Sequence, residues 1–251
     1  MAGRTFAVGD IHGEVEHLTR VWAKLPPLDS GDTVVFLGDY VNRGPHPKDV
    51  VEFLMDLPTK TPARIVCLRG NHEDAWLRAR GEGFDGFMLK LEHGCLSTLR
   101  SFTGGPVPKP GEEPTDAEME LLSSGDFLPA PVVEWMAQLP FWHEDDNGIY
   151  VHAGLPRGPD GFLHPSKVHP AAMLAWVRTD DFVRNYRGKN VVFGHTPVRL
   201  LPEELSHYTP DDPLDAWIND DTAGLDTGCG IGGFLTIMER PALRVFESRD
   251  A

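Results

Sequence analysis

Residues 33–44 have the sequence TVVFLGDYVNRG, a mostly apolar run that leads into polar side chains enclosed by two glycines. The run 33–37 is short and bounded by turn residues, as a strand buried on both faces is. The loop at the carboxyl end of this strand would carry Asp39, an oxygen ligand suited to hard metal ions. The segment therefore predicts a buried strand that delivers a metal ligand to one edge of a sheet.

Two further segments repeat this arrangement. Strand-like residues 6–8 precede GDIHG at 9–13, and strand-like residues 64–68 lead to GNHE at 70–73. Between the strands, apolar residues recur at helical spacing within 15–25 and 50–57. This β-loop-α alternation predicts neighbouring parallel strands with their ligand-bearing loops at one edge.

The later part of the chain has a different organisation. From 81 to 131 the alternation lapses, and glycines and prolines predict a loop-rich insert with two short helices, which would cap the site. Strand character then returns at 149–151, 190–193, 234–238 and 243–246. We therefore expect a single domain over residues 1–251, mixing α and β structure: a two-sheet β-sandwich flanked by helices, with the cap as an insert.

Five strand ends carry side chains that bind divalent metals. The later half of the chain has two more such runs, VHAG at 151–154 and FGHT at 193–196, which add two imidazoles to the ligands of the three earlier runs. One such residue alone is more often a helix cap or an ordinary polar group, but five at five strand ends favour a dinuclear site. The absence of cysteine among these candidates favours Mn, Fe or Zn over thiolate chemistry, and we expect two divalent ions, Mn before Fe or Zn. The candidate ligands are Asp10, His12, Asp39, Asn71, His152 and His195.

The series GDxHG, GDxVxRG and GNHE resembles the phosphoprotein phosphatase branch of the calcineurin-like metallophosphoesterases, and in detail its short bacterial members. The resemblance runs from Asp10 to about Thr236 and includes LDTGC at 225–229. It implies a β-sandwich fold in which Asp39 bridges two ions. It also implies that the first ion is held by Asp10 and His12, and the second by Asn71, His152 and His195. Hydrolysis would then proceed by direct attack of a metal-bridging hydroxide.

Three more residues are candidates for catalysis. His72 follows a ligand directly and is the candidate general acid, because an imidazolium can protonate a leaving group near neutral pH. Arg43 and Arg178 are the candidate phosphate clamps, since guanidinium matches phosphate oxygens two at a time. For Arg178, which rests on a resemblance of WVR at 176–178, the alternative is a surface cation at a helix end. Glu73 is expected to orient its neighbours or cap a helix.

Asn42 departs from the family pattern. Relatives usually have Asp at this position, where it partners the general-acid histidine. Asn42 can hydrogen-bond the His72 ring but cannot supply the negative charge that favours imidazolium. We therefore expect His72 to be a weaker or lower-pKa acid here, with activity shifted toward acidic pH or toward better leaving groups.

Composition excludes some partners. The 251 residues carry a formal net charge of −15, which argues against nucleic acid or an anionic membrane. Six carboxylates within 112–126 and seven within 203–221, with no Lys or Arg in either stretch, predict solvated faces or a rim that repels acidic substrates. Three cysteines without disulfide spacing, and no signal-like apolar start, predict a cytoplasmic protein.

Three functions are compatible with these residues. The sequence favours a protein phosphatase acting on phosphoserine or phosphothreonine, or on phosphotyrosine. A hydrolase of dinucleotides such as diadenosine tetraphosphate comes second, and a catalytically impaired module that binds metal or phosphopeptide third. The oligomeric state stays open.

Overall fold

The first sheet has the strand order β12-β11-β1-β2-β3 in the computed structural model, which describes residues 3–83, 85–178, 180–208 and 212–249. Strands β1, β2 and β3 are parallel neighbours, as the alternation predicts, whereas β11 runs antiparallel to β1. The strands are β1 (Thr5–Val8), β2 (Thr33–Phe36), β3 (Arg64–Cys67), β11 (Thr236–Arg240) and β12 (Arg244–Glu247).

The second sheet has the order β4-β5-β8-β10-β9. Its central strands β5, β8 and β10 are parallel, so their carboxyl ends also share one edge. The strands are β4 (Trp142–Asp145), β5 (Gly148–Val151), β8 (Val191–Phe193), β9 (Trp217–Ile218) and β10 (Thr222–Gly224). A separate hairpin consists of β6 (Arg157–Gly158) and β7 (Gly161–Phe162).

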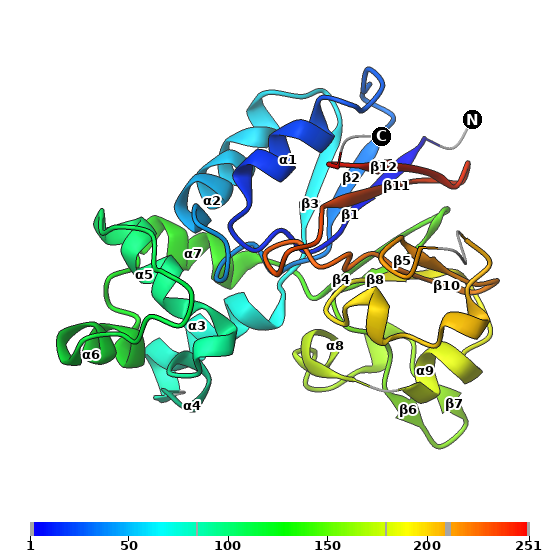
Figure 1. Ribbon diagram of the computed structural model, residues 1–251. Helices are drawn as coiled ribbons and strands as arrows, with labels where there is room; N and C mark the ends of the chain where they lie inside the picture. The colour runs from blue at the N-terminus through cyan, green and yellow to red at the C-terminus, as the bar shows by residue number, and fades with distance from the viewer. Residues whose placement is uncertain (1–2, 84, 179, 209–211, 250–251) are drawn as a thin grey trace.

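The two sheets pack face to face, which confirms the predicted sandwich. Along β1 the side chains alternate: Phe6 and Val8 pack toward helices α1 (Val15–Trp22) and α2 (Pro47–Asp56), while Ala7 lies in the core between the sheets. In the second sheet Tyr150 lies in that shared core, and its neighbours on β5 face α8 and α9. Each sheet thus has helices on its outer face and the other sheet on its inner face (Figure 1).

The helices divide into three groups. Those on the sandwich are α1 (Val15–Trp22), α2 (Pro47–Asp56), α8 (Met173–Trp176) and α9 (Asp180–Asn185). A separate helical layer, with its own buried core, contains α3 (Asn71–Glu82), α4 (Asp85–Met88), α5 (Cys95–Thr103), α6 (Asp116–Ser124) and α7 (Ala130–Gln138). Short 3-10 helices are Leu57–Thr59, Leu91–His93, Pro165–Lys167, Val198–Leu200 and Glu203–Leu205.

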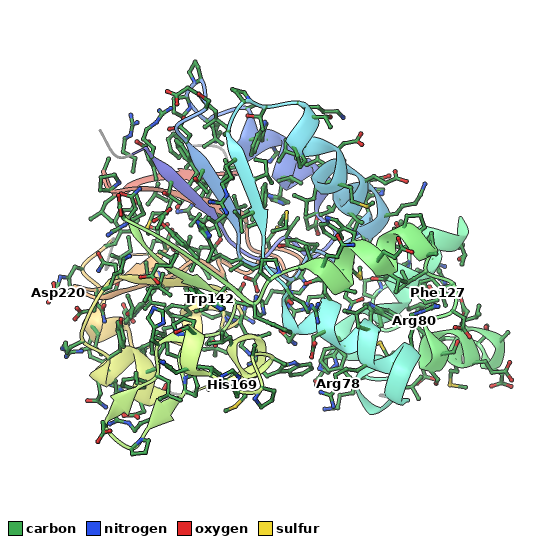
Figure 2. All side chains as sticks on the ribbon, turned by 180° about the vertical axis from the view of Figure 1, so that it is seen from behind. Arg78, Arg80, Phe127, Trp142, His169 and Asp220 are labelled. Atoms are coloured by element: carbon green, nitrogen blue, oxygen red, sulfur yellow. The ribbon has the colours of Figure 1, made fainter. Side chains whose placement is uncertain are left out.

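The segment 81–131 is more helical than the sequence predicts. It contains α4, α5 and α6, and the end of α3 and the start of α7 also fall within it. The reason is that glycines end helices here: Gly94 and Gly104 flank α5 with φ of 65° and 77°, and Gly125 ends α6 with φ of 65°. Figure 2 shows Arg80 and Phe127 on this helical layer, apart from Trp142 and Asp220 on the second sheet's side.

The two acidic stretches are partly neutralised by arginines distant in the sequence. Arg100 donates to Glu112 and Glu118, each at 2.8 Å. Arg249 pairs with Asp212 at 2.7 Å and also with Asp215. The sequence prediction of a repulsive rim counted only charges within each stretch, so it overstated the local negative charge.

Candidate metal centre

All six predicted metal ligands meet at one edge of the sandwich. Parallel strands of the first sheet end at Asp10, Asp39 and Asn71, and strands of the second sheet end at His152 and His195. The side chains are buried although they are polar, which is costly unless they are paired or bind an ion.

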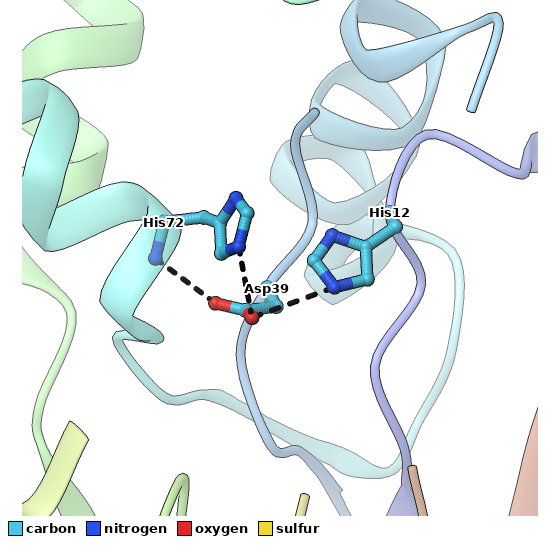
Figure 3. A group of neighbouring side chains, drawn as sticks. All are labelled: His12, Asp39 and His72. Carbon is cyan, nitrogen blue, oxygen red and sulfur yellow. Dashed lines mark hydrogen bonds and ion pairs between the residues drawn. The ribbon is translucent and has the colours of Figure 1, made fainter. Parts of the chain in front are cut away.

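Asp39 lies at the centre of this cluster. Its Oδ2 is 3.5 Å from His12 Nε2 and 3.8 Å from His72 Nε2 (Figure 3). Its Oδ1 is 3.4 Å from His152 Nε2. Within the described ranges, two groups are compact enough to hold one ion each: His12, Asp39 and His72, and Asp39, His152 and His195. Asp39 belongs to both, which is the position of a bridging carboxylate.

The imidazoles beside Asp39 are oriented as metal ligands. His12 Nδ1 donates to the carbonyl of Val41 at 3.0 Å, and His152 Nδ1 donates to the carbonyl of Leu37 at 2.9 Å. Since a carbonyl only accepts, each ring presents Nε2 toward the carboxylate, with its lone pair when the ring is neutral. A neutral Nε2 and a carboxylate oxygen of Asp39, 3.4–3.5 Å apart, repel each other unless a positive charge lies between them. Although burial opposes the charged form, Asp39 raises the pKa of His152 to about 9.

Asn71 adds an oxygen atom to the second group, which contains Asp39, His152 and His195. Its Oδ1 is 3.0 Å from His152 Nε2 and 2.8 Å from His195 Nδ1. Oxygen and nitrogen atoms of this kind suit a divalent ion of the Mn, Fe or Zn type, and no thiolate takes part. The donor set at this edge therefore fits two divalent ions.

Asp10 is placed differently from the other ligand candidates. Both of its oxygens face the backbone N–H of His195, at 3.2 and 2.9 Å, and it belongs to neither compact group, whereas His72 belongs to one. Burial and the nearby Asp226 carboxylate raise the pKa of Asp10 well above its usual range. Asp226 Oδ2 is buried and accepts no hydrogen bond from the residues described. Asp226 is the residue of this edge that the sequence did not single out, although it lies in the quoted motif LDTGC.

Glu73 fixes the loop that carries Asp39, as an orienting residue should. Its Oε2 accepts the backbone N–H of Asp39 at 2.9 Å and of Gly70 at 3.0 Å. Its Oε1 accepts the N–H of Tyr40 at 2.8 Å and of Val41 at 3.3 Å. The loop needs this support because Asp39 has a φ of 56°, a backbone conformation that is unfavourable for most residues.

Asn42 contacts His72 through a bond whose direction is fixed. The indole N–H of Trp76, which can only donate, lies 3.0 Å from Asn42 Oδ1, and the Thr98 hydroxyl donates to the same oxygen at 2.6 Å. The amide nitrogen of Asn42 therefore faces His72 Nδ1, at 2.7 Å. Because this nitrogen donates, His72 Nδ1 must accept, and the ring carries at most the proton on Nε2. Burial acts in the same direction and lowers the pKa of His72 to about 3.

The two predicted phosphate clamps contact the two groups of imidazoles. Arg43 Nη1 donates to His12 Nε2 at 2.6 Å, and Arg178 Nε donates to His195 Nε2 at 2.9 Å. Arg43 is partly buried and Arg178 is exposed. The structure thus brings both arginines to the same edge as the candidate metal ligands.

None of the helices in the described ranges combines the length and apolar composition that crossing a membrane requires.

Comparison with known proteins agrees with this geometry. The model of the calcineurin-like phosphoesterase family matches residues 3–225. A bis(5'-nucleosyl)-tetraphosphatase (asymmetrical) of Anoxybacillus flavithermus is 26% identical, over 94% of this chain and 90% of its own length.

Solved structures show the same fold. A putative diadenosine tetraphosphatase superposes with a TM-score of 0.57 and 22% identity, over 98% of this chain and 93% of that one. A cold-active protein-tyrosine phosphatase of a psychrophilic Shewanella species superposes with a TM-score of 0.56 and 15% identity, over 98% and 78%. The family hydrolyses phosphoric esters and uses divalent metals. With its own strand-end cluster of Asp, Asn and His, the chain belongs to the calcineurin-like phosphoesterases.

Proposed function

We propose that this enzyme cleaves a phosphoanhydride bond in a dinucleoside polyphosphate such as diadenosine tetraphosphate. The observation that carries the proposal is the direction of the hydrogen bond between Asn42 and His72. Because His72 is then a poor proton donor, an alcohol would be a poor leaving group at this site, whereas a nucleotide would be a good one.

The leaving group decides the rate at this site because His72 gives up a proton with difficulty. His72 accepts at Nδ1, so giving up its Nε2 proton would leave an imidazolate, which is too basic to form readily. A serine or threonine alkoxide depends on such a proton, since alcohols are very weak acids. A phenol has a pKa of about 10, and a terminal phosphate group one of about 6. A nucleotide therefore leaves as a stable anion without help from His72.

The metal assignment forms part of the same proposal. One ion would be held by Asp10, His12 and Asp39, and the other by Asp39, Asn71, His152 and His195, with manganese preferred. Bound ions would polarise the phosphoryl oxygens and activate a water. Arg43 now donates to His12 Nε2, the nitrogen that an ion would occupy, so its N–H group would then turn to substrate phosphates. Arg178 donates to His195 Nε2, on the other side of that ring from Asn71, and would contact the substrate phosphates from there.

The relatives and the charge distribution support the dinucleotide over the protein substrate. Several curated relatives that match this chain over nearly their whole length are named as tetraphosphatases. The negative charge that argued against a polyphosphate is partly paired, for instance Glu118 with Arg100. A phosphotyrosine phosphatase is the second candidate, because a phenolate is the next best of these leaving groups.

A substrate panel tests the proposal. The manganese-loaded enzyme is assayed with diadenosine tetraphosphate, para-nitrophenyl phosphate, a phosphotyrosine peptide and a phosphoserine peptide. We expect kcat/KM for the dinucleotide to exceed that for the phosphoserine peptide by at least about 100-fold, the lower range of general-acid effects. Equal or faster turnover of the phosphoserine peptide contradicts the proposal. No turnover with two bound ions supports the binding-module alternative.

A further inference from the structure

A cavity of about 310 Å³ opens beside Arg43, on the side of the helical layer. The segment 88–97 and the loop 108–114 form its walls, and Gly230 and Ile231 approach from the second half of the chain. This volume lies at the lower end of the range for small-molecule sites, about 300–1,000 Å³. A cavity beside Arg178 has only about 160 Å³. The Arg43 side thus has more room for an organic group.

The walls of the cavity combine exposed apolar surface with positive charge. Leu89, Leu91 and Ile231 are 39%, 50% and 37% exposed, and together they place apolar surface on the walls of this one cavity. Lys90 and Lys109 also line the cavity. Of the carboxylates that line it, Glu112 pairs with Arg100, and Glu92 is exposed. The cavity therefore suits a ligand with an apolar, planar part and an anionic part.

The wall is fixed relative to Arg43. The backbone N–H of Arg43 donates to the carbonyl of Gly94 at 3.1 Å, and the Ser97 hydroxyl donates to the carbonyl of Gly44. A Cβ at Gly94 would lie 2.6 Å from Arg43 Cα, so the two segments are in direct backbone contact. The Arg43 Nε is buried and has no hydrogen-bond partner in the part of the chain that is described. Arg43, which lines the cavity, thus has an unpaired guanidinium N–H.

We propose that this cavity binds one nucleoside of the substrate, with the adjoining phosphates directed to Arg43. The base packs against Leu91 and Ile231, and Lys90 and Lys109 attract the phosphate chain. This assignment rests on the dinucleotide function proposed above and adds where the substrate is held. It makes the insert a specificity element, whereas the metal cluster supplies the chemistry common to all phosphoesters.

Two variants of the wall test the assignment. Leu91→Asp and Lys109→Glu are compared with Leu243→Asp and Lys167→Glu, the same changes at exposed positions outside the cavity lining. We expect the KM for diadenosine tetraphosphate to rise about tenfold in the wall variants and not in the controls. The kcat and KM for para-nitrophenyl phosphate, which has no nucleoside, should change no more in Leu91→Asp than in its control Leu243→Asp.

Inhibition by ADP separates failure of this inference from failure of the proposed function. ADP should inhibit para-nitrophenyl phosphate hydrolysis competitively, with an inhibition constant about tenfold weaker in the wall variants. If the enzyme cleaves the dinucleotide but the wall variants keep their KM and inhibition constant, the cavity assignment is wrong and the proposed function stands. If the dinucleotide is not cleaved and ADP inhibition is nevertheless lost in the wall variants, the function fails and the nucleotide site stands. Circular dichroism shows whether Leu91→Asp folds; if it does not, Lys109→Glu decides.

Discussion

His152 and His72 lie against the same carboxylate of Asp39, yet different kinds of group orient them. The His152 ring is held by a backbone carbonyl, that of Leu37, and presents Nε2 to Asp39 whichever side chains surround it. The His72 ring is held by the side chain of Asn42, whose own direction depends on Trp76 and Thr98. A ring fixed by the backbone keeps its role when side chains change. A ring fixed by side chains can change its chemistry through one substitution.

The largest loss of activity is expected from a change at Asp39, the residue that His152 and His72 both contact. Asp39→Asn removes the charge of the proposed bridging ligand, so metal content should fall below two ions per chain. Turnover of para-nitrophenyl phosphate should drop by at least about 1,000-fold, because bound ions supply several kcal/mol of transition-state stabilisation. Elemental analysis and steady-state kinetics measure both. Asp49→Asn, the same change at an exposed helix position, is the control; full metal content in Asp39→Asn contradicts the bridge.

Glu73→Gln tests the half of the site that depends on the backbone. The amide would place a donor against two of the four backbone N–H groups that Glu73 accepts, leaving them unsatisfied. At about 1–3 kcal/mol each, we expect a loss of about 3 kcal/mol in the free energy of unfolding. The melting temperature should then fall by roughly 6–12 °C. Exposed Glu134→Gln serves as the control, and a melting temperature within 2 °C of the parent's would show that the loop does not need this carboxylate.

Asn42→Asp tests the half that depends on side chains. A carboxylate can accept from Trp76, Thr98 and a protonated His72 Nδ1 together, so the His72 pKa should rise and the ring should become a proton donor. We expect kcat/KM for a phosphoserine peptide to rise about tenfold relative to the dinucleotide. The protonated ring exists below its pKa, so the gain should be lost as pH rises through that value. Parallel pH profiles with the two substrates measure it; an unchanged ratio at every pH would refute the role of Asn42.

The smallest effect is expected from Thr98→Val. The indole of Trp76 still donates to Asn42 Oδ1, so the amide keeps its direction and the substrate ratio should change less than threefold. The Asn42 backbone N–H loses its acceptor, at a cost of about 1 kcal/mol in stability. Chemical denaturation and the substrate panel together measure this. A substrate ratio like that of Asn42→Asp would mean that Thr98, and not Trp76, sets the direction.

The same contrast explains what the sequence could predict. Asp39 and His152 follow closely after buried apolar runs, so local sequence places them at strand ends. Parallel pairing gathers such ends at one edge within each sheet, and the packing of the two sheets brings the two edges together. Trp76 and Thr98 lie 34 and 56 positions from Asn42, on helices where their patterns indicate only packing. Which donor reaches which oxygen depends on how α3 and α5 pack, and no local pattern records that. Hence Asn42 could be recognised as unusual, but the direction of its bond could not.

The insert shows a second limit of local patterns. Glycines such as Gly94 and Gly104 predict a loop, yet both lie at the ends of α5. Whether such glycines end a helix or belong to a loop depends on whether the residues between them have a buried face. The acidic run near Glu118 reads as unpaired charge because its partner, Arg100, lies on another helix. In both cases the missing information is a contact between segments distant along the chain.

The four backbone hydrogen bonds that Glu73 accepts have a consequence for engineering this centre. They join the loop after β2 to the loop after β3 through one carboxylate, so neither loop holds its shape as an independent part. A designer who grafts residues 38–44 onto another scaffold without 70–73 would carry over Asp39 but not Glu73, the carboxylate that holds its loop. The smallest transplantable unit is therefore a pair of loops on adjacent parallel strands, and host scaffolds should be chosen for that spacing.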